Sequence, residues 1–299
     1  MSEMKDGWHE VDMPDYLAWP YVSSSLVGAW KHRTPRYVRW LLDGGGDDEQ
    51  KAVYTLGSLT HTAILEPDLL DVLYVCEPEP DPAKFLTGKG EPSSNPRATK
   101  AFKEAVAELE ATGKTVVTYD QWTEAVAMRD SVHGHKKASA LLKAEGPVEI
   151  SGVVTDEETG VRLKIRPDKL VNPIGANVNI KTSQNAAEDA WVHDLFKFGY
   201  FRDFAFYERA LKQLGFDHKH AIALVLDSKG PKDDRVAVYE IDEGALDAGH
   251  QLVRKYLIQI AECMNSGIWP GHPEDIVSIS LPPYAWTRVD EEIAQEVYA

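Results

Sequence analysis

The residues best suited to chemistry lie in the stretch VRLKIRPDKLVNPIGANVNIKTSQ, residues 161–184. Two runs that mix apolar and charged side chains flank a Pro/Gly/Asn loop, and both runs suit β-strands. Side chains alternate along a strand, so Asn179 and Lys181 share the outward face of the second run, and a neighbouring strand could bring Asp168 beside them. A carboxylate, an amide and an ammonium in one place make either an ordinary polar strand end or most of a metal-dependent active site.

The elements around this stretch predict an α/β or α+β protein. The first half of the chain reads as helical, because serine caps precede apolar runs and apolar residues recur at helical spacing. From residue 147 the period changes to two, which predicts a hairpin, a third strand and then helices alternating with strands. We expect a pair of helices that ends near residue 42, and further helices at 51–66, 97–112, 120–143, 185–215 with a break near Gly199, and 243–267. We expect the hairpin at 147–171 and further strands at 176–182, 220–228 and 234–242. Residues 77–96 are expected to form a mobile loop. This order predicts a mixed central sheet flanked by helices.

The composition argues against several classes of protein. The two cysteines, Cys76 and Cys263, are far apart and suggest no disulfide framework. We find no secretory signal and no apolar run long enough to span a membrane, so we expect a cytoplasmic protein. A formal net charge of −16 argues against coating of nucleic acid, but not against a nuclease, whose metal-binding carboxylates add negative charge. The sequence contains neither a GxxxxGK[ST] loop nor a GxSxG elbow, so neither an ATP-driven motor nor a serine hydrolase is supported.

Four segments, in order, carry a resemblance to a known family. In chain order they are LGSLTHTAILEPD, GKTVVTYDQWTEAVAMRDSVHGHKKASALL, TDEETGVRLKIRPDKL and NIKT. The RPDKL that ends the third segment and the NIKT place Asp168 and Asn179 eleven residues apart. Together they resemble the RecE-type exonucleases (exodeoxyribonuclease VIII) of phages and prophages, in the PD-(D/E)xK nuclease superfamily. The resemblance covers roughly residues 20–290. It implies a PD-(D/E)xK core at 146–299 and an N-terminal helical portion at 1–145 packed on it, as one continuous globular domain.

The resemblance assigns roles to individual residues. His61 matches a histidine that helps to bind a metal ion from a helix ahead of the sheet, and Asp168 matches the first motif carboxylate, a direct ligand. Lys181 matches the lysine that orients or activates the attacking water. Glu149 lies where related nucleases often have a supporting acid. Mg²⁺ is the implied cofactor, with Mn²⁺ able to substitute, and carboxylates, waters and a backbone carbonyl such as that of Ile180 would form its shell.

Asn179 departs from the motif, which has Asp or Glu at this position. An amide oxygen can touch a metal ion but carries no net charge, so the change is expected to weaken metal binding and catalysis, leaving low activity or none. One explanation, which we favour, is a deliberate isosteric substitution that preserves the fold and blocks cleavage. The other is a natural variant whose missing carboxylate comes from Glu149 or elsewhere.

Three further residues are candidate DNA contacts. Arg166 shares a strand face with the motif carboxylate and could reach DNA, or it could pair with acids across the sheet. Many relatives carry QxxxY near the DNA phosphate, and these positions here read Asp203 and Tyr207, which share a helix face. Asp203 would repel a phosphate unless it binds metal or pairs with Arg202 or Arg209. Tyr207 suits a position in the core equally well.

The expected function is a metal-dependent exonuclease that degrades one strand of linear duplex DNA from the 5′ end in phage-type recombination. By resemblance, it acts on double-stranded DNA ends as a closed homo-oligomeric ring, with a RecT-like single-strand annealing protein, in a bacterial host cell. Two rival functions stay open. One is a RecB-like or restriction-type endonuclease, and the other is a non-catalytic DNA-binding module that kept the nuclease fold.

Overall fold

Helices and strands alternate along the chain much as the change of period predicts. The computed structural model describes residues 4–46 and 49–297. The strands are β1 (Gly7–His9), β2 (Tyr74–Cys76), β3 (Thr115–Val117), β4 (Ser151–Thr155), β5 (Arg162–Ile165), β6 (Lys169–Val171), β7 (Ala176–Ser183), β8 (His220–Asp227) and β9 (Val236–Glu240). The α-helices are α1 (Met13–Ala18), α2 (Ser24–His32), α3 (Pro35–Leu42), α4 (Glu49–Leu65), α5 (Pro67–Leu73), α6 (Lys100–Glu110), α7 (Tyr119–Gly134), α8 (Lys136–Lys143), α9 (Glu188–Lys197), α10 (Tyr200–Gln213), α11 (Glu243–Ser266) and α12 (Pro283–Val297).

The central sheet is mixed and four strands wide, in the order β6-β7-β8-β9. β7 and β8 run parallel, whereas β6 and β9 run antiparallel to their neighbours. In this register Asn179 lies opposite Ala223 and Lys181 lies opposite Val225. Strands that are covered on both faces read as nearly continuous apolar runs, and β8, HAIALVLD, has this character. The predicted mixed sheet flanked by helices is confirmed.

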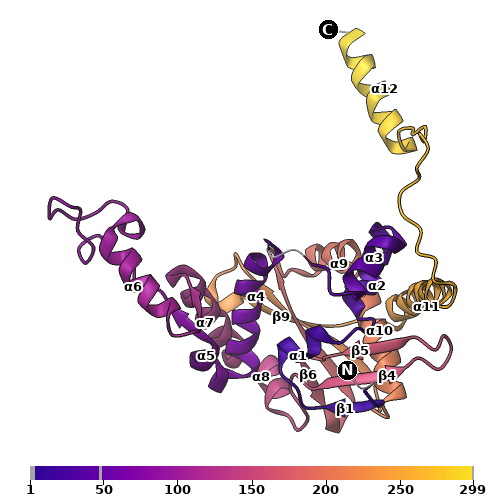
Figure 1. The fold of residues 1–299 in the computed structure, drawn as a ribbon, viewed down its shortest axis with the longest axis horizontal. Helices are drawn as coiled ribbons and strands as arrows, with labels where there is room; N and C mark the ends of the chain where they lie inside the picture. The colour runs from indigo at the N-terminus through magenta and orange to yellow at the C-terminus, as the bar shows by residue number, and fades with distance from the viewer. Residues whose placement is uncertain (1–3, 47–48, 298–299) are drawn as a thin grey trace.

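Helices cover both faces of the central sheet (Figure 1). One face packs against α4, α7 and α8, through Val178, Ile180, Ile222, Leu224 and Leu226 of the sheet and Ile64, Met128, Val132, Ala138 and Leu141 of the helices. The other face packs against α9 and α10, through Ala221, Ala223 and Val225 of the sheet and Trp191 and Phe204 of the helices. The alternation of β7 therefore places Asn177, Asn179 and Lys181 on the α10 side.

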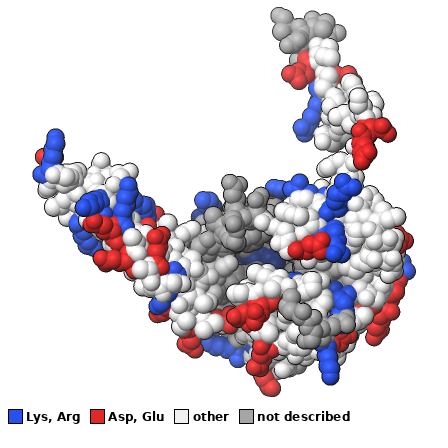
Figure 2. Space-filling model, viewed as in Figure 1, with Lys and Arg blue, Asp and Glu red and all other residues white. Residues whose placement is uncertain are grey.

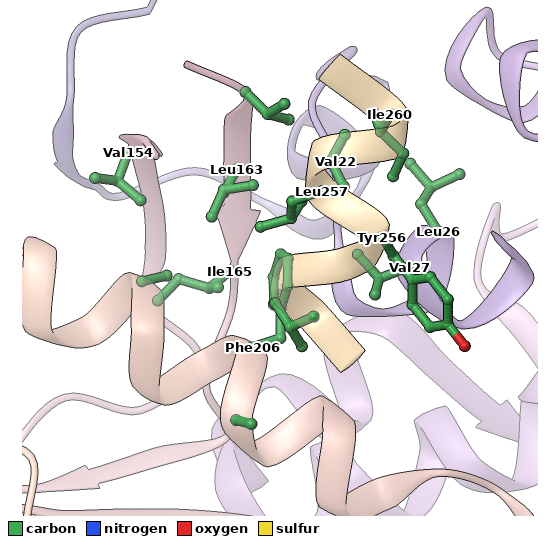
Figure 3. Close-up of a cluster of buried hydrophobic side chains, with 14 of the residues drawn as sticks. Val22, Leu26, Val27, Val154, Leu163, Ile165, Phe206, Tyr256, Leu257 and Ile260 are labelled. Atoms are coloured by element: carbon green, nitrogen blue, oxygen red, sulfur yellow. The ribbon is translucent and has the colours of Figure 1, made fainter. Parts of the chain in front are cut away.

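A second sheet, in the order β1-β4-β5, lies beside the central one. Its apolar face joins α2, α10 and α11 in a large cluster that includes Leu163 and Ile165, shown in Figure 3. The expected single strand through residue 171 is wrong, because β5 ends at Ile165 and β6 starts at Lys169 in the other sheet. Pro167 lies in the gap and has no N–H to extend a ladder. Asp168 therefore belongs to the crossing between the two sheets.

The other predicted elements are close to those observed. The expected helix at 120–143 is two helices, because His135 ends α7 and accepts a hydrogen bond from the N–H of Ala138 at the start of α8. The break near Gly199 separates α9 from α10, with this glycine at φ +74°. The division of the chain at residues 145 and 146 stays a prediction.

After α11, Trp269 packs against the main core cluster, and the carbonyl of Pro270 accepts from the N–H of Arg36 at 3.0 Å. The C-terminal arm, residues 273–297, then leaves the body of the molecule and ends in α12 (Figure 1). Its large apolar side chains are exposed, including Ile276 at 103% and Ile279 at 91%, and on α12 Trp286 at 49% and Ile293 at 57%. Among the described residues, no helix combines the length and apolar character needed to cross a membrane.

Candidate active site

Three potential metal ligands converge from three separate segments. His61 comes from α4, Glu149 from the segment before β4, and Asp168 from the crossing before β6. One ligand atom from each lies within 4.8 Å of the other two. His61 Nδ1 is 3.8 Å from Asp168 Oδ2 and 3.9 Å from Glu149 Oε1. The backbone joins the two acids as well, because the N–H of Glu149 donates to the carbonyl of Asp168 at 3.2 Å.

Asp168 also links this cluster to β7. The backbone N–H of Ile180 donates to Asp168 Oδ2 at 2.6 Å. A cavity of 80 Å³ opens beside this bond, and it is lined by Ser24, Asp168, Asn179, Lys181, Asp203, Phe204 and Tyr207. The cavity is large enough to hold an ion together with ordered water. The structure thus brings the two motif strands together at the expected residues.

Asn179 does not point outward into solvent, as the alternation suggested. Its exposed fraction is 5% and that of Asn177 is 0%, because α10 covers this face of β7. Asn179 Nδ2 donates to Asn177 Oδ1 at 3.1 Å, which leaves Asn177 Nδ2 buried with no hydrogen-bond partner among the described residues. If both amides are flipped, the surplus N–H moves to Asn179 instead. A carboxylate at position 179 could accept from Asn177 Nδ2, so the pair of amides is one acceptor short.

The basic side chains near the cavity do not compensate for the burial of Asp168 and Asp203. Burial raises the pKa of Asp168, and His61 and Lys181 reduce that rise without cancelling it. Burial alone would lower the pKa of His61, but the carboxylates of Asp168 and Glu149 outweigh burial and raise the pKa above its ordinary value. Burial also raises the pKa of Asp203, against the opposing effects of Arg202 and Lys181. A divalent cation would relieve this shortage.

Glu149 is held in place by an unusual backbone and a buried cation. Its φ of +48° is the only positive value at a non-glycine among the described residues, and such strain is common at functional sites. Arg166 Nε donates to Glu149 Oε2 at 2.8 Å, while Arg166 Nη1 donates to Ser151 Oγ at 2.8 Å and to the carbonyl of Val11 at 2.9 Å. Arg166 is therefore engaged inside the protein, and a DNA contact through it stays a prediction.

The two candidates on α10 both line the cavity. Tyr207 is partly buried against the main core cluster, and its hydroxyl donates to the carbonyl of Arg166 at 3.1 Å, so it has the core character that the sequence allowed. Asp203 accepts from Arg202 Nη2 at 3.0 Å, the pairing considered from the sequence. Sequence reasoning missed Ser24, whose SSS context at the start of α2 suggested only a helix cap.

Lys164 contributes to the fold and lies away from the cluster. Its Nζ donates to the last carbonyls of α1, at 3.1 Å to Tyr16, 3.1 Å to Leu17 and 2.8 Å to Trp19. The carbonyls of Tyr16 and Trp19 also accept from the N–H groups of Trp19 and Tyr21, so the ammonium adds positive charge to a turn that already closes the C-terminal end of α1.

The comparisons with known proteins agree with this geometry. Residues 23–282 match the model of a PDDEXK-like domain of unknown function (DUF3799). The chain belongs to this PDDEXK-like family. The resemblance to RecE-type enzymes of the PD-(D/E)xK superfamily is thereby confirmed at the level of the fold family, and the protein has a nuclease fold. No curated protein matched the chain.

Solved structures include one with a clear overall likeness to this PDDEXK-like chain. A candidate exonuclease from Eubacterium rectale is 13% identical, with a TM-score of 0.57 over 93% of this chain and 98% of that one. A phage-related exonuclease from Haemophilus somnus is 13% identical, with a TM-score of 0.30 over 56% and 84%. An alkaline exonuclease from Laribacter hongkongensis is 16% identical, with a TM-score of 0.27 over 57% and 86%. The first supports the fold, and the other two are too distant to add to it.

The residues present fit a hard divalent cation. PDDEXK nucleases use such ions, and the cluster offers two carboxylates and an imidazole, with the carbonyls of β7 nearby. His61, Glu149 and Asp168 would hold the ion, and Asn179 would offer only a neutral oxygen.

Proposed function

We propose that this PDDEXK-like protein is a metal-dependent exonuclease that acts on the ends of linear double-stranded DNA. The observation that carries the proposal is the convergence of His61, Glu149 and Asp168 within 4.8 Å, beside a cavity that Lys181 lines. Mg²⁺ is the proposed cofactor and Mn²⁺ its substitute, and the bound ion would polarise a phosphoryl oxygen and lower the pKa of a water.

The protein's own residues would orient the reacting groups. The Lys181 ammonium lies 5.3 Å from the centre of the Tyr200 ring, a contact that limits its motion and keeps it beside the cavity. There it would hold the attacking water or the scissile phosphate through N–H donors. Arg166 would fix the Glu149 carboxylate, and the Ile180 N–H would fix Asp168.

Digestion from the 5′ end, a role in phage-type recombination and a RecT-like annealing partner are proposed from the resemblance. A homo-oligomeric ring is supported by the C-terminal arm, because exposed apolar side chains of this kind mark interaction surfaces. Acidic and basic side chains are interspersed on the face drawn in Figure 2, so this face of a single copy has no continuous basic surface that could bind DNA. Assembly into a ring would bring basic side chains of several copies together around the DNA. We propose that the arm binds a second copy. A chain ending at His272, which keeps the core contacts of Trp269 and Pro270, should then sediment as a monomer while the full chain sediments as a larger species.

The test is digestion of 5′-labelled and 3′-labelled linear duplex with Mg²⁺, using the chain as it stands and the variant Asn179→Asp. We expect nucleotides to be released from the 5′ end of linear DNA, while covalently closed circular duplex survives. Cleavage of the circle would instead assign an endonuclease. A chelator should abolish the activity, and Mn²⁺ should restore it.

Asn179 favours one second candidate, a DNA-binding module without catalysis. A neutral amide at a motif acid position is what a lost activity would leave behind. If neither the chain nor Asn179→Asp cleaves DNA while both bind duplex, this second function replaces the first.

A further inference from the structure

The cavity contains a second carboxylate on the wall opposite the motif strands. Asp203 lies in the first turn of α10, and it lines the same 80 Å³ space as Asp168, Asn179 and Lys181. Its side chain is 24% exposed. Asp203 Oδ1 accepts from Arg202 at 3.0 Å, whereas Oδ2 has no hydrogen-bond partner in the part of the chain that the structure describes. An oxygen carrying charge is therefore free to serve the cavity.

Arg202 holds this carboxylate from behind. Its side chain is buried, and its guanidinium fits between two glycines. A Cβ at Gly28 would lie 2.9 Å from Arg202 Nη2, and a Cβ at Gly199 would lie 2.8 Å from Nη1. Gly28 and Gly199 thus leave room for the guanidinium of Arg202, which donates a hydrogen bond to Asp203. A carboxylate fixed in this way loses little conformational freedom when it binds a ligand.

The amide of Asn179 cannot supply the charge that this side of the cavity lacks. One end of the amide hydrogen-bonds Asn177, and in either orientation of the side chain the group left for the cavity carries no charge. Among the cavity residues that come from RPDKL and NIKT, only Asp168 carries a negative charge, and the positive charge of Lys181 offsets it. A hard cation selects sites by the number and charge of their oxygen ligands.

We propose that Asp203 supplies a further cation-binding carboxylate of this site, in addition to Asp168 and Glu149 and in place of the motif acid that Asn179 does not provide. Asp168 and Asp203, which line the same cavity, would both hold the cation, and Asn179 would offer only a neutral oxygen. This inference rests on the proposed function for the identity of the bound ion. It also makes Asn179 compatible with an active enzyme, because the acid has moved from β7 to α10.

The test exchanges the acid between the two positions. Four proteins are compared, namely the chain as it stands, Asp203→Asn, Asn179→Asp, and the double variant Asn179→Asp with Asp203→Asn. Mn²⁺ affinity is measured by titration calorimetry, and Mg²⁺-dependent cleavage of linear duplex is measured separately. Glu262→Gln on α11, which removes an exposed acid away from the cavity, is the matched control and should change neither by more than about twofold.

We expect Asp203→Asn to weaken Mn²⁺ binding by about tenfold or more and to abolish cleavage, and the double variant to recover both by returning a carboxylate to β7. Recovery also shows that the Asp203→Asn background still folds. If Asp203→Asn binds Mn²⁺ as tightly as the parent, Asp203 is not a ligand and the inference is overturned, whether or not DNA is cleaved. If Mn²⁺ binding follows the expected pattern but none of the four proteins cleaves DNA, Asp203 stands as a ligand and the proposed nuclease function fails.

Discussion

Two buried carboxylates, Asp168 and Glu208, lie near histidines, yet their surroundings are opposite in character. The Asp168 carboxylate has His61 Nδ1 at 3.8 Å and, among the described residues, accepts one hydrogen bond, from the backbone N–H of Ile180. Glu208, on α10, pairs with Lys212 and with His250 at 3.0 Å, and has His218 at 3.7 Å. Burial raises the pKa of Asp168, whereas the neighbouring side chains of His218, His250 and Lys212 hold the pKa of Glu208 far below its usual range.

The difference separates a stabilising cluster from a binding site. Lys212, His250 and His218 surround the Glu208 carboxylate, so the ionised acid is more stable in the folded protein than in water. Asp168 is less stable when ionised, and it stands at a cavity with another acid, a lysine and a surplus amide. Buried polar groups that lack partners within the protein are common at functional sites, where a bound ligand supplies the missing partner. Histidine and carboxylate in proximity are therefore insufficient to define a metal site.

The largest expected effect is that of Asp168→Asn on cleavage. Removing a direct ligand should lower the initial rate by about a thousandfold, because ion binding and the position of the ion both depend on this carboxylate. Stability in a chelator should stay the same or rise, since at neutral pH the buried acid is less stable ionised in the folded state than in the unfolded state. Initial rates and thermal melts of the two proteins measure both effects. A large loss of stability would show that Asp168 is a structural acid like Glu208.

Arg166→Met should give the largest loss of stability. It leaves Glu149 buried without its cation and removes the donors to Ser151 and Val11, which should cost about 3 kcal/mol in denaturant unfolding. Adding Glu149→Gln should recover part of that loss, because the uncompensated charge is removed. Equal stability of the single and double variants would mean that Arg166 acts through packing alone.

The sequence predicts the approach of Asp168 to Asn179 and Lys181 because period-two runs and a short loop constrain neighbouring strands. It cannot show that Pro167 lies between two sheets, since that depends on which strand the next segment pairs with. The role of Arg166 also escapes sequence reasoning, because the left-handed backbone of Glu149 and the carbonyl of Val11 come from segments distant in sequence. Local pattern fixes the strands, and tertiary packing decides which charges are used internally.

Glu208→Gln is expected to affect stability and leave cleavage almost unchanged. It replaces charge-assisted hydrogen bonds from Lys212 and His250 by neutral ones, which should cost about 2 kcal/mol. The cleavage rate should stay within about twofold, because Glu208 is not among the residues that line the cavity. Unfolding in urea and initial rates on linear duplex provide the two measurements. A rate loss like that of Asp168→Asn would place Glu208 in the site.

The smallest and most specific expected effect is the pH dependence of the stability difference between the parent and Glu208→Gln. A carboxylate whose pKa is lower in the folded state contributes stability above its unfolded pKa, about 4.3 for Glu, and loses that contribution as pH falls toward the folded value. The stability difference between the parent and Glu208→Gln should therefore shrink below about pH 5, by up to about 1.4 kcal/mol for each further unit of acidification. Urea unfolding of both proteins between pH 7 and pH 3 measures it. A difference that grows on acidification would mean that Glu208 resembles Asp168, with a pKa raised by burial, and the contrast between the two clusters would be lost.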